Sequence, residues 1–200
     1  MKKLILVGVT IGIASLAQAT SITVSTPTTL SGNDAYTVGI DLSVPANQQI
    51  NSLTISFDDI QLTSVPKGYL YIDLLNLNIP GIQAVSDGDK SGDYFLSYLN
   101  SGQGVALGTE VFNSKNETLS FSITFNADEL AALNLYAADG IFDLGIDPDC
   151  SFKLPKSCCS ISYTTCPKTP PHVPDTASTA GLLGVGFIGL LLFRRKLALS

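Results

Sequence analysis

An alternation of apolar and polar residues runs through most of this 200-residue chain. Successive side chains of a β-strand point to opposite faces, so a period of two is typical of strands that bury one face and expose the other. Turn-forming stretches such as 45–47 and 113–116 separate the alternating segments. The pattern predicts strands over residues 36–44, 53–57, 75–79 and 119–125.

Many short antiparallel strands at this spacing favour an all-β fold, an antiparallel β-sandwich of jelly-roll or immunoglobulin-like type. One short helix is expected to interrupt the strands. Asn126 can cap its first turn, and Glu129 stands at the capping-box position. Leu130 and Leu133 can face the core, and Gly140 lies just beyond the expected end of the helix.

Residues 1–19 have the parts of a secretory signal peptide. Lys2 and Lys3 form a positive start, residues 4–16 are mostly apolar, and the small residues Ala17 and Ala19 suit a cleavage site. We therefore expect an N-terminal signal helix that is removed, so that the mature protein begins at Thr20.

The C-terminal residues predict a short membrane helix. The apolar run 180–193 would make about 21 Å of helix at 1.5 Å per residue. A comfortable span needs roughly 20 apolar residues, so this anchor is marginal. Arg194, Arg195 and Lys196 follow and would hold the end in the cytoplasm. The length of the apolar run alone is compatible with either a transient or a permanent membrane anchor.

This C-terminal segment resembles the sorting signal of the PEP-CTERM family of exported bacterial proteins, in its Val-Pro-Asp variant. The residues that carry the resemblance are Val173, Pro174, Asp175, Ser178, Thr179, Arg194, Arg195 and Lys196. The resemblance implies cutting near the tripeptide by an exosortase, an integral-membrane processing enzyme. It also implies an exported protein that is held transiently in the inner membrane and then passes to the cell surface or extracellular matrix.

These features divide the chain into four parts. Four prolines between residues 167 and 174 predict a stiff, extended stalk between the body and the anchor. The expected parts are a signal peptide over 1–19, a β-sandwich domain over 20–163, a proline-rich stalk with the sorting motif over 164–176, and a transmembrane sorting helix with a basic tail over 177–200.

The body between the two ends is acidic. It holds 6 of the 11 Lys and Arg residues and 16 of the 17 Asp and Glu residues, which gives a net charge of −10. Such a body repels nucleic acid and anionic lipid and attracts cations. We therefore exclude nucleic acid as a partner.

The cysteines of the chain are Cys150, Cys158, Cys159 and Cys166. An even number in one short stretch of an exported chain predicts two disulfides. A bridge between Cys158 and Cys159 would be strained, so two connectivities remain open. Cys150 pairs with Cys158 and Cys159 with Cys166, or Cys150 pairs with Cys159 and Cys158 with Cys166.

Calcium is the one cofactor for which the sequence offers particular candidate ligands. Asp87, Asp89, Ser91 and Asp93 place oxygen atoms at alternate positions around Gly92, as at the start of an EF-hand loop. The position of the closing glutamate holds Tyr98 instead. A solvated turn explains the same residue types equally well. Asp143, Asp147 and Asp149 form a weaker second candidate.

Residues 138–150 carry a second resemblance, to an Ala-Asp-Gly…Asp-Pro-Asp-Cys element near the end of β-sandwich domains in the same exported family. There the element closes the last strands, and those domains mostly lack a known activity. The resemblance implies a sandwich and no particular reaction.

We do not expect an enzyme. The single histidine, His172, lies in the stalk, so the body lacks the base of a Ser-His or Cys-His site. Asp58 and Asp59 are the most suggestive carboxylate pair, although an exposed strand end or bulge also accounts for them.

Three functions follow. The first is an exported structural or adhesive protein of the cell envelope or extracellular matrix. The second is a calcium-dependent carbohydrate-binding module, with extracellular polysaccharide as its partner and Tyr69, Tyr71, Tyr94 and Tyr98 as stacking residues. The third is a small secreted hydrolase.

Overall fold

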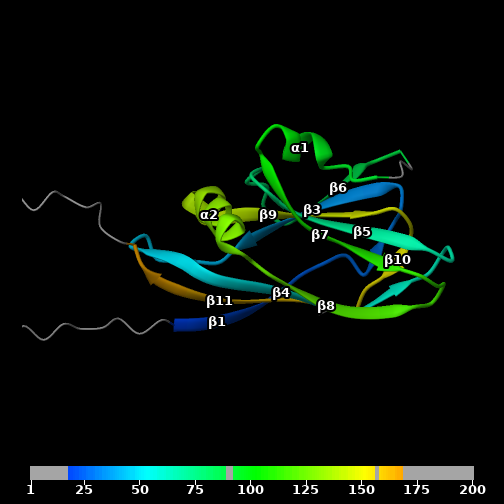
Figure 1. The fold of residues 1–200 in the computed structure, drawn as a ribbon, viewed down its shortest axis with the longest axis horizontal. Helices are drawn as coiled ribbons and strands as arrows, with labels where there is room; N and C mark the ends of the chain where they lie inside the picture. Colours follow the sequence, from blue (N-terminus) through cyan, green and yellow to red (C-terminus); the bar gives the residue numbers. More distant parts are fainter. Residues whose placement is uncertain (1–17, 89–91, 156–157, 169–200) are drawn as a thin grey trace, which may run out of the picture. The chain divides into compact units, whose positions relative to one another are not determined.

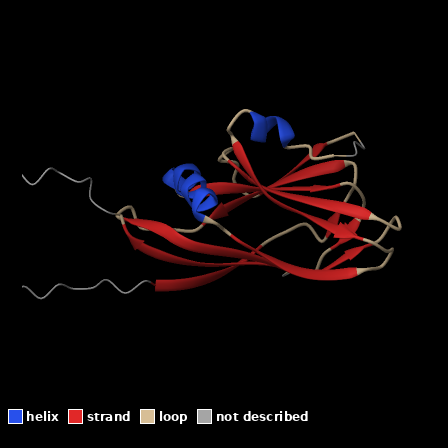
Figure 2. Cartoon of the chain, viewed as in Figure 1, coloured by secondary structure: helices blue, strands red, loops and turns tan. Residues whose placement is uncertain are grey.

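The structure is a computed structural model of the chain that describes residues 18–88, 92–155 and 158–168. The chain divides into two units, Met1–Pro167 and Lys168–Ser200, and the described strands and helices all lie in the first unit. Strands make up most of this unit (Figure 2), which confirms the prediction of a mainly β fold.

The first of two sheets is antiparallel and has the order β1-β11-β4-β10-β2, with β8 paired to the opposite edge of β4. Its longest strand, β4, pairs with β11 over most of its length and so forms the middle of the layer. The strands of this sheet are β1 (Gln18–Val24), β2 (Thr29–Leu30), β4 (Gln48–Leu62), β8 (Thr118–Thr124), β10 (Phe152–Lys153) and β11 (Cys159–Pro167).

The second sheet is also antiparallel and has the order β6-β3-β9-β5-β7, so that β9 is its central strand. The element that resembles a closing segment thus lies in the middle of a sheet. The strands are β3 (Asp34–Asp41), β5 (Gly68–Leu75), β6 (Ile82–Ser86), β7 (Gly104–Phe112) and β9 (Ile141–Pro148).

The main core fills the space between the two sheets, as in a sandwich. Phe112 of β7 and Phe152 of β10 meet edge to face across this space, with ring centroids 4.8 Å apart. Phe57 and Phe142 are also fully buried. Burying a side chain of this size contributes about 1.5–3 kcal/mol, so these residues hold the layers together.

Two helices join the strands (Figure 1). The predicted one, α2 (Ala127–Tyr136), is confirmed with its capping box, because Asn126 accepts from the backbone of Glu129 and Glu129 accepts from that of Asn126. A short turn, η1 (Ala137–Asp139), follows and ends at Gly140 with a φ of 101°. The other helix, α1 (Leu96–Asn100), was not predicted from the sequence; Figure 1 shows it over the second sheet.

Three of the four strands predicted from alternation are confirmed as β3, β4 and β8. The strand predicted over 75–79 is wrong, because β5 ends at Leu75 and the chain then turns, with positive φ at Asn78 and Gly81. Leu77 packs against a small apolar cluster on the sheet. A loop that buries every second side chain has the same alternation as a strand.

The strands also shift the expected domain boundaries. β11 continues to Pro167, so four residues assigned to the stalk belong to the sheet. β1 begins at Gln18 and pairs Ala19 with Thr164, so it includes the end of the predicted signal peptide. Both predicted terminal helices lie outside the described residues. Within 18–88, 92–155 and 158–168 there is no helix of the length and apolarity that a membrane crossing requires.

Candidate functional site

The central part of the outer face of the second sheet, which points away from the sandwich core, is covered by loops. Gly145 of β9 lies at its centre, between Thr37 of β3 and Asp73 of β5. The Phe95 ring lies over it, since a Cβ atom at Gly145 would be 2.9 Å from that ring. Phe95, Ala35 and Leu75 form a second small apolar cluster there. The segment before and within α1 is thus packed onto the sheet.

Five carboxylates gather where this segment meets the sheet, and we call them the aspartate cluster. Asp73 and Asp147 are diagonal neighbours on paired strands, because Asp73 pairs with Gly145 and Tyr71 with Asp147. Two more come from the covering segment and one from the end of β9. The members are Asp73, Asp87, Asp93, Asp147 and Asp149.

Backbone N–H groups of the covering segment hold three of these side chains. Tyr94 donates to Asp147 Oδ2 at 2.7 Å, and Gly92 donates to Asp149 Oδ1 at 3.2 Å. Phe95 donates to Asp93 Oδ1 at 2.8 Å. Each of these bonds occupies one carboxylate oxygen and fixes the segment to β9 or to its own turn.

The buried members of the cluster are incompletely bonded. Asp73, Asp87 and Asp147 are only 1%, 3% and 0% exposed. Four of their oxygens have no hydrogen-bond partner among the described residues, namely Asp73 Oδ2, both oxygens of Asp87, and Asp147 Oδ1. Burying an ionised carboxylate without a partner is costly, so the site needs a proton or a cation.

The pKa values of the cluster also show that its negative charge is not neutralised. Burial, followed by the charges of Asp93 and Asp147, raises the pKa of Asp73 to about 8. Burial also raises the pKa of Asp147 to about 7, and the charges of Asp87, Asp93 and Asp149 add to this effect, while the Tyr94 N–H opposes it. The pKa values of Asp93 and Asp149 are raised as well, again mainly by burial.

This arrangement is chemically suited to holding a cation with oxygen ligands. No group of three or more His, Cys, Asp or Glu side chains in the described part of the chain has the arrangement of a formed metal site. Asp73 and Asp93 share a side-chain hydrogen bond, which favours a protonated Asp73 beside an ionised Asp93. Carboxyls with a pKa near 7 also suit acid–base catalysis, but Asp73 and Asp147 are too buried to touch a substrate.

The structure changes the sequence-based calcium hypothesis. Asp87 and Asp93 both lie near Asp147, whereas Asp89 and Ser91 lie outside the described residues. The second candidate group is divided, because Asp147 and Asp149 join this cluster. Its third member, Asp143, instead accepts the Ile79 N–H at 3.2 Å.

Asp73 was missed by the sequence analysis. A charged residue in the apolar strand 70–75 was the available signal, because a carboxylate on a largely buried strand requires a special partner.

An open cavity of about 530 Å³ adjoins the aspartate cluster. Its lining includes Asp87, Asp93, Tyr94, Leu96 and Tyr98. The predicted stacking tyrosines therefore form two groups. Tyr94 and Tyr98 border this cavity and flank Phe95, whereas Tyr69 and Tyr71 stack on each other along β5 with ring centroids 6.4 Å apart.

The two predicted disulfides are absent, and all four cysteines are free thiols. Both predicted connectivities use Cys166, and both are wrong. Cys159 and Cys166 lie on the same extended strand, where seven residues span about 23 Å. A disulfide needs Cα atoms within roughly 7 Å. The Cys150 thiol packs over Gly68, and the Cys158 thiol contacts the Thr26 hydroxyl at 3.2 Å.

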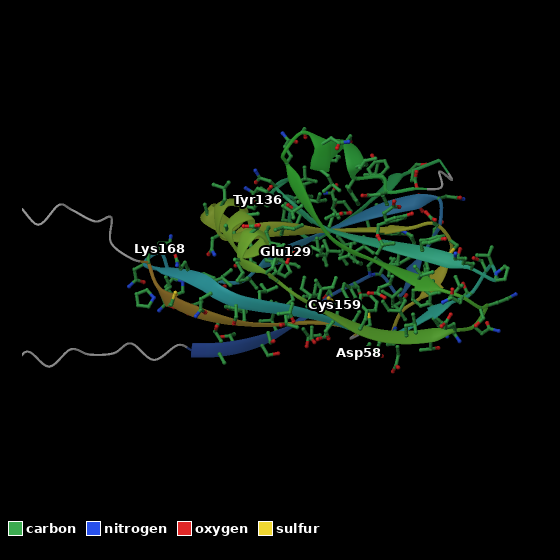
Figure 3. The ribbon with its side chains drawn as sticks, viewed as in Figure 1. Asp58, Glu129, Tyr136, Cys159 and Lys168 are labelled. Atoms are coloured by element: carbon green, nitrogen blue, oxygen red, sulfur yellow. The ribbon has the colours of Figure 1, made fainter. Side chains whose placement is uncertain are left out.

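The carboxylate pair Asp58 and Asp59 is a β-bulge. The pairing of β4 with β8 shifts register between Phe57 and Ile60, and Asp59 has a φ of 57°. Both aspartates are exposed, and Figure 3 shows Asp58 at the surface of the first sheet. The Asp59 N–H donates to the Ser120 hydroxyl. A role in shaping the strand accounts for this pair.

Comparison with known proteins identifies the C-terminal segment. Residues 172–197 match the VPDSG-CTERM motif, a variant of the PEP-CTERM type of exosortase sorting signal. The chain keeps Val173, Pro174 and Asp175, and has Thr176 and Ala177 where the motif's name has Ser and Gly. No curated protein matches the chain.

The motif indicates export, processing by an exosortase-type membrane enzyme, and transient membrane anchoring before display at the cell surface. The residues that match it lie outside the described part of the structure.

Proposed function

Because the chain carries an exosortase-type sorting signal, we propose that it is a non-enzymatic structural or adhesive protein of the cell envelope or extracellular matrix. The sorting signal is the observation that carries this proposal. It delivers the β-sandwich to the surface, where a rigid layered domain acts through its exposed faces.

The charge and the carboxylates of the body support this role. A body of net charge −10 remains soluble and associates with cationic or calcium-bridged polymers rather than with nucleic acid. Of the carboxylates with raised pKa values, Asp73 and Asp147 are buried and Asp93 and Asp149 are partly buried. The exposed pair Asp58–Asp59 forms a bulge.

Sorting is tested by changing Pro174 or Asp175 to alanine in the full chain. Each change should leave the protein in the inner-membrane fraction with its tail attached, because the recognition element is lost while the apolar run remains. Thr176→Ala is the matched control, since the chain already departs from the motif there, and it should be processed normally. An intact Arg194-Arg195-Lys196 tail on surface protein, shown by mass spectrometry, contradicts this part of the proposal.

The structural or adhesive role is tested in cells that lack the gene. These cells should lose surface attachment or matrix cohesion, and the wild-type gene should restore it. Restoration by a Pro174→Ala variant that stays in the inner membrane would exclude a role at the surface.

The open cavity beside the aspartate cluster favours calcium-dependent carbohydrate binding as a second function. Tyr94 and Tyr98 offer aromatic surface for a sugar ring next to the carboxylates of Asp87 and Asp93. Extracellular polysaccharide is the ligand class that such a surface would meet.

A glycan array probed with and without calcium tests this second function. Binding should require calcium and should be lost in Tyr98→Ala but kept in Tyr69→Ala, because Tyr69 is not part of the cavity lining. Binding that persists in Tyr98→Ala, or the absence of binding to any glycan, excludes this site.

A further inference from the structure

The aspartate cluster contains more negative charge than its surroundings neutralise. All the charged groups that act on Asp73, Asp147 and Asp149 among the described residues are themselves acidic. Like charges in a buried site repel one another, and each also loses its hydration. In the absence of a cation, protons must supply the missing positive charge.

Three of these side chains also point to a ligand individually. Asp73, Asp87 and Asp147 are at least 97% buried and together leave four carboxylate oxygens without partners among the described residues. In Asp87 both oxygens are unsatisfied. Native proteins rarely bury unsatisfied polar atoms, and a bound ion is one of the accepted explanations.

The elements that hold these oxygens are well fixed. Asp73 and Asp147 project from adjacent strands of one sheet. The Asp87 N–H donates to the Asn33 carbonyl at 2.9 Å, and Tyr94 binds Asp147 at 2.7 Å. The backbone that carries Asp73, Asp87 and Asp147 is thus held in place by strand pairing and hydrogen bonds.

We propose that Asp73, Asp87, Asp93, Asp147 and Asp149 form a calcium site that fastens the covering segment before α1 to the outer face of the second sheet. Calcium takes six to eight oxygen ligands at 2.3–2.6 Å in flexible geometry, which several carboxylates from separate elements can provide. Magnesium requires a tighter octahedron and retains water, which suits a buried acidic site poorly. This site differs from an EF-hand loop, because β5 and β9 supply ligands.

The proposal does not rest on the structural or adhesive function, because calcium binding needs neither sorting nor adhesion. The calcium-dependent carbohydrate binding, in contrast, requires this site. Its test uses the exported full chain, freed of metal with a chelator and then titrated with calcium. Equilibrium dialysis should give one calcium per chain, and the melting temperature should rise with the logarithm of calcium concentration above the dissociation constant. Magnesium at the same concentrations should have much less effect.

Charge-removing variants locate the ion. Asp87→Asn and Asp147→Asn should each weaken calcium binding by at least about tenfold, as disturbance of a metal's surroundings does. Asp58→Asn removes the same charge from the bulge in the first sheet and should bind calcium like the wild type. If Asp147→Asn does not fold, Asp87→Asn decides the outcome, because Asp87 makes no side-chain hydrogen bond to be lost within the described residues.

Terbium luminescence supplies an independent readout, since the chain has no tryptophan and tyrosine is its only strong sensitiser. Terbium that occupies the site should emit on tyrosine excitation, and calcium should displace it. Tyr94→Phe should reduce the emission, whereas Tyr163→Phe, in the main core, should not.

Any of three results overturns the proposal. The first is a melting temperature that does not respond to millimolar calcium. The second is calcium binding that is unchanged in both Asp87→Asn and Asp147→Asn. The third is a magnesium response equal to that of calcium.

Discussion

The two faces of β9 are both buried, but they are built from opposite chemistry. Phe142, Leu144 and Ile146 point between the sheets and belong to the main core. Asp143, Gly145 and Asp147 point outward, beneath loops. The inward face is stabilised by apolar contacts, which do not require one particular partner. The outward face depends on specific bonds and charges.

The inward face of β9 therefore maintains the fold, whereas the outward face can respond to pH and to cations. Asp143 is held by the Ile79 N–H, while Asp147, four residues along the same face, keeps one oxygen without a partner in the described structure. A strand buried on both faces usually carries apolar residues on both. The departure from that rule on the outward face marks it as the candidate site.

The largest effect should come from the inward face. Phe142→Ala should lower the free energy of unfolding by about 3–5 kcal/mol, because it removes a fully buried ring and leaves a cavity. Urea denaturation measures this change, and calcium should not restore it. A loss below 1 kcal/mol would show that the core tolerates the cavity and that the two faces differ less than we infer.

The outward face should make the metal-free protein less stable as pH rises. The pKa values of Asp73 and Asp147 are raised from 3.8 to about 8 and about 7, so the folded state holds protons that the unfolded state has released. Stability from these groups is therefore complete below about pH 4 and is lost as pH rises toward 8. Thermal unfolding in chelator should show this fall, and Asp73→Asn should reduce it. A wild-type profile identical to that of the variant contradicts the assignment.

Gly145→Ala should disturb the covering segment without reaching the main core. A Cβ atom there would lie 2.9 Å from Leu75 and Phe95, so the Phe95 ring must move. Overpacking of this kind costs about 1–3 kcal/mol. Hydrogen exchange should increase around residues 92–103 while β4 and β11 stay protected. Uniform loss of protection would mean that the two faces unfold together.

The smallest effect concerns the thiols. Burial raises the pKa of Cys159 to about 12, and Figure 3 shows this residue between the sheets. Because only the thiolate is alkylated at a useful rate, native protein should react first at the partly exposed Cys166. Peptide mapping should find no bridge from Cys166 to Cys158 or Cys159; such a bridge would require β11 to be unpaired.

The sequence by itself determined the class of the fold, the capped helix α2 and the sorting signal. Each depends on a local pattern: alternation along a strand, the pair Asn126 and Glu129, and the tripeptide with its apolar run. Such patterns act between residues that are close in the chain, so they can be recognised without knowing which segments meet.

Only the tertiary structure decided where the aspartates meet, how β11 separates the cysteines, and that residues 76–80 form a loop. Asp73 lies 74 residues before Asp147, and they become neighbours only because β5 and β9 pair in one register. A strand of the opposite register would turn either carboxylate into the apolar core. The cluster therefore results from the strand pairing, and the local pattern of neither segment specifies that pairing.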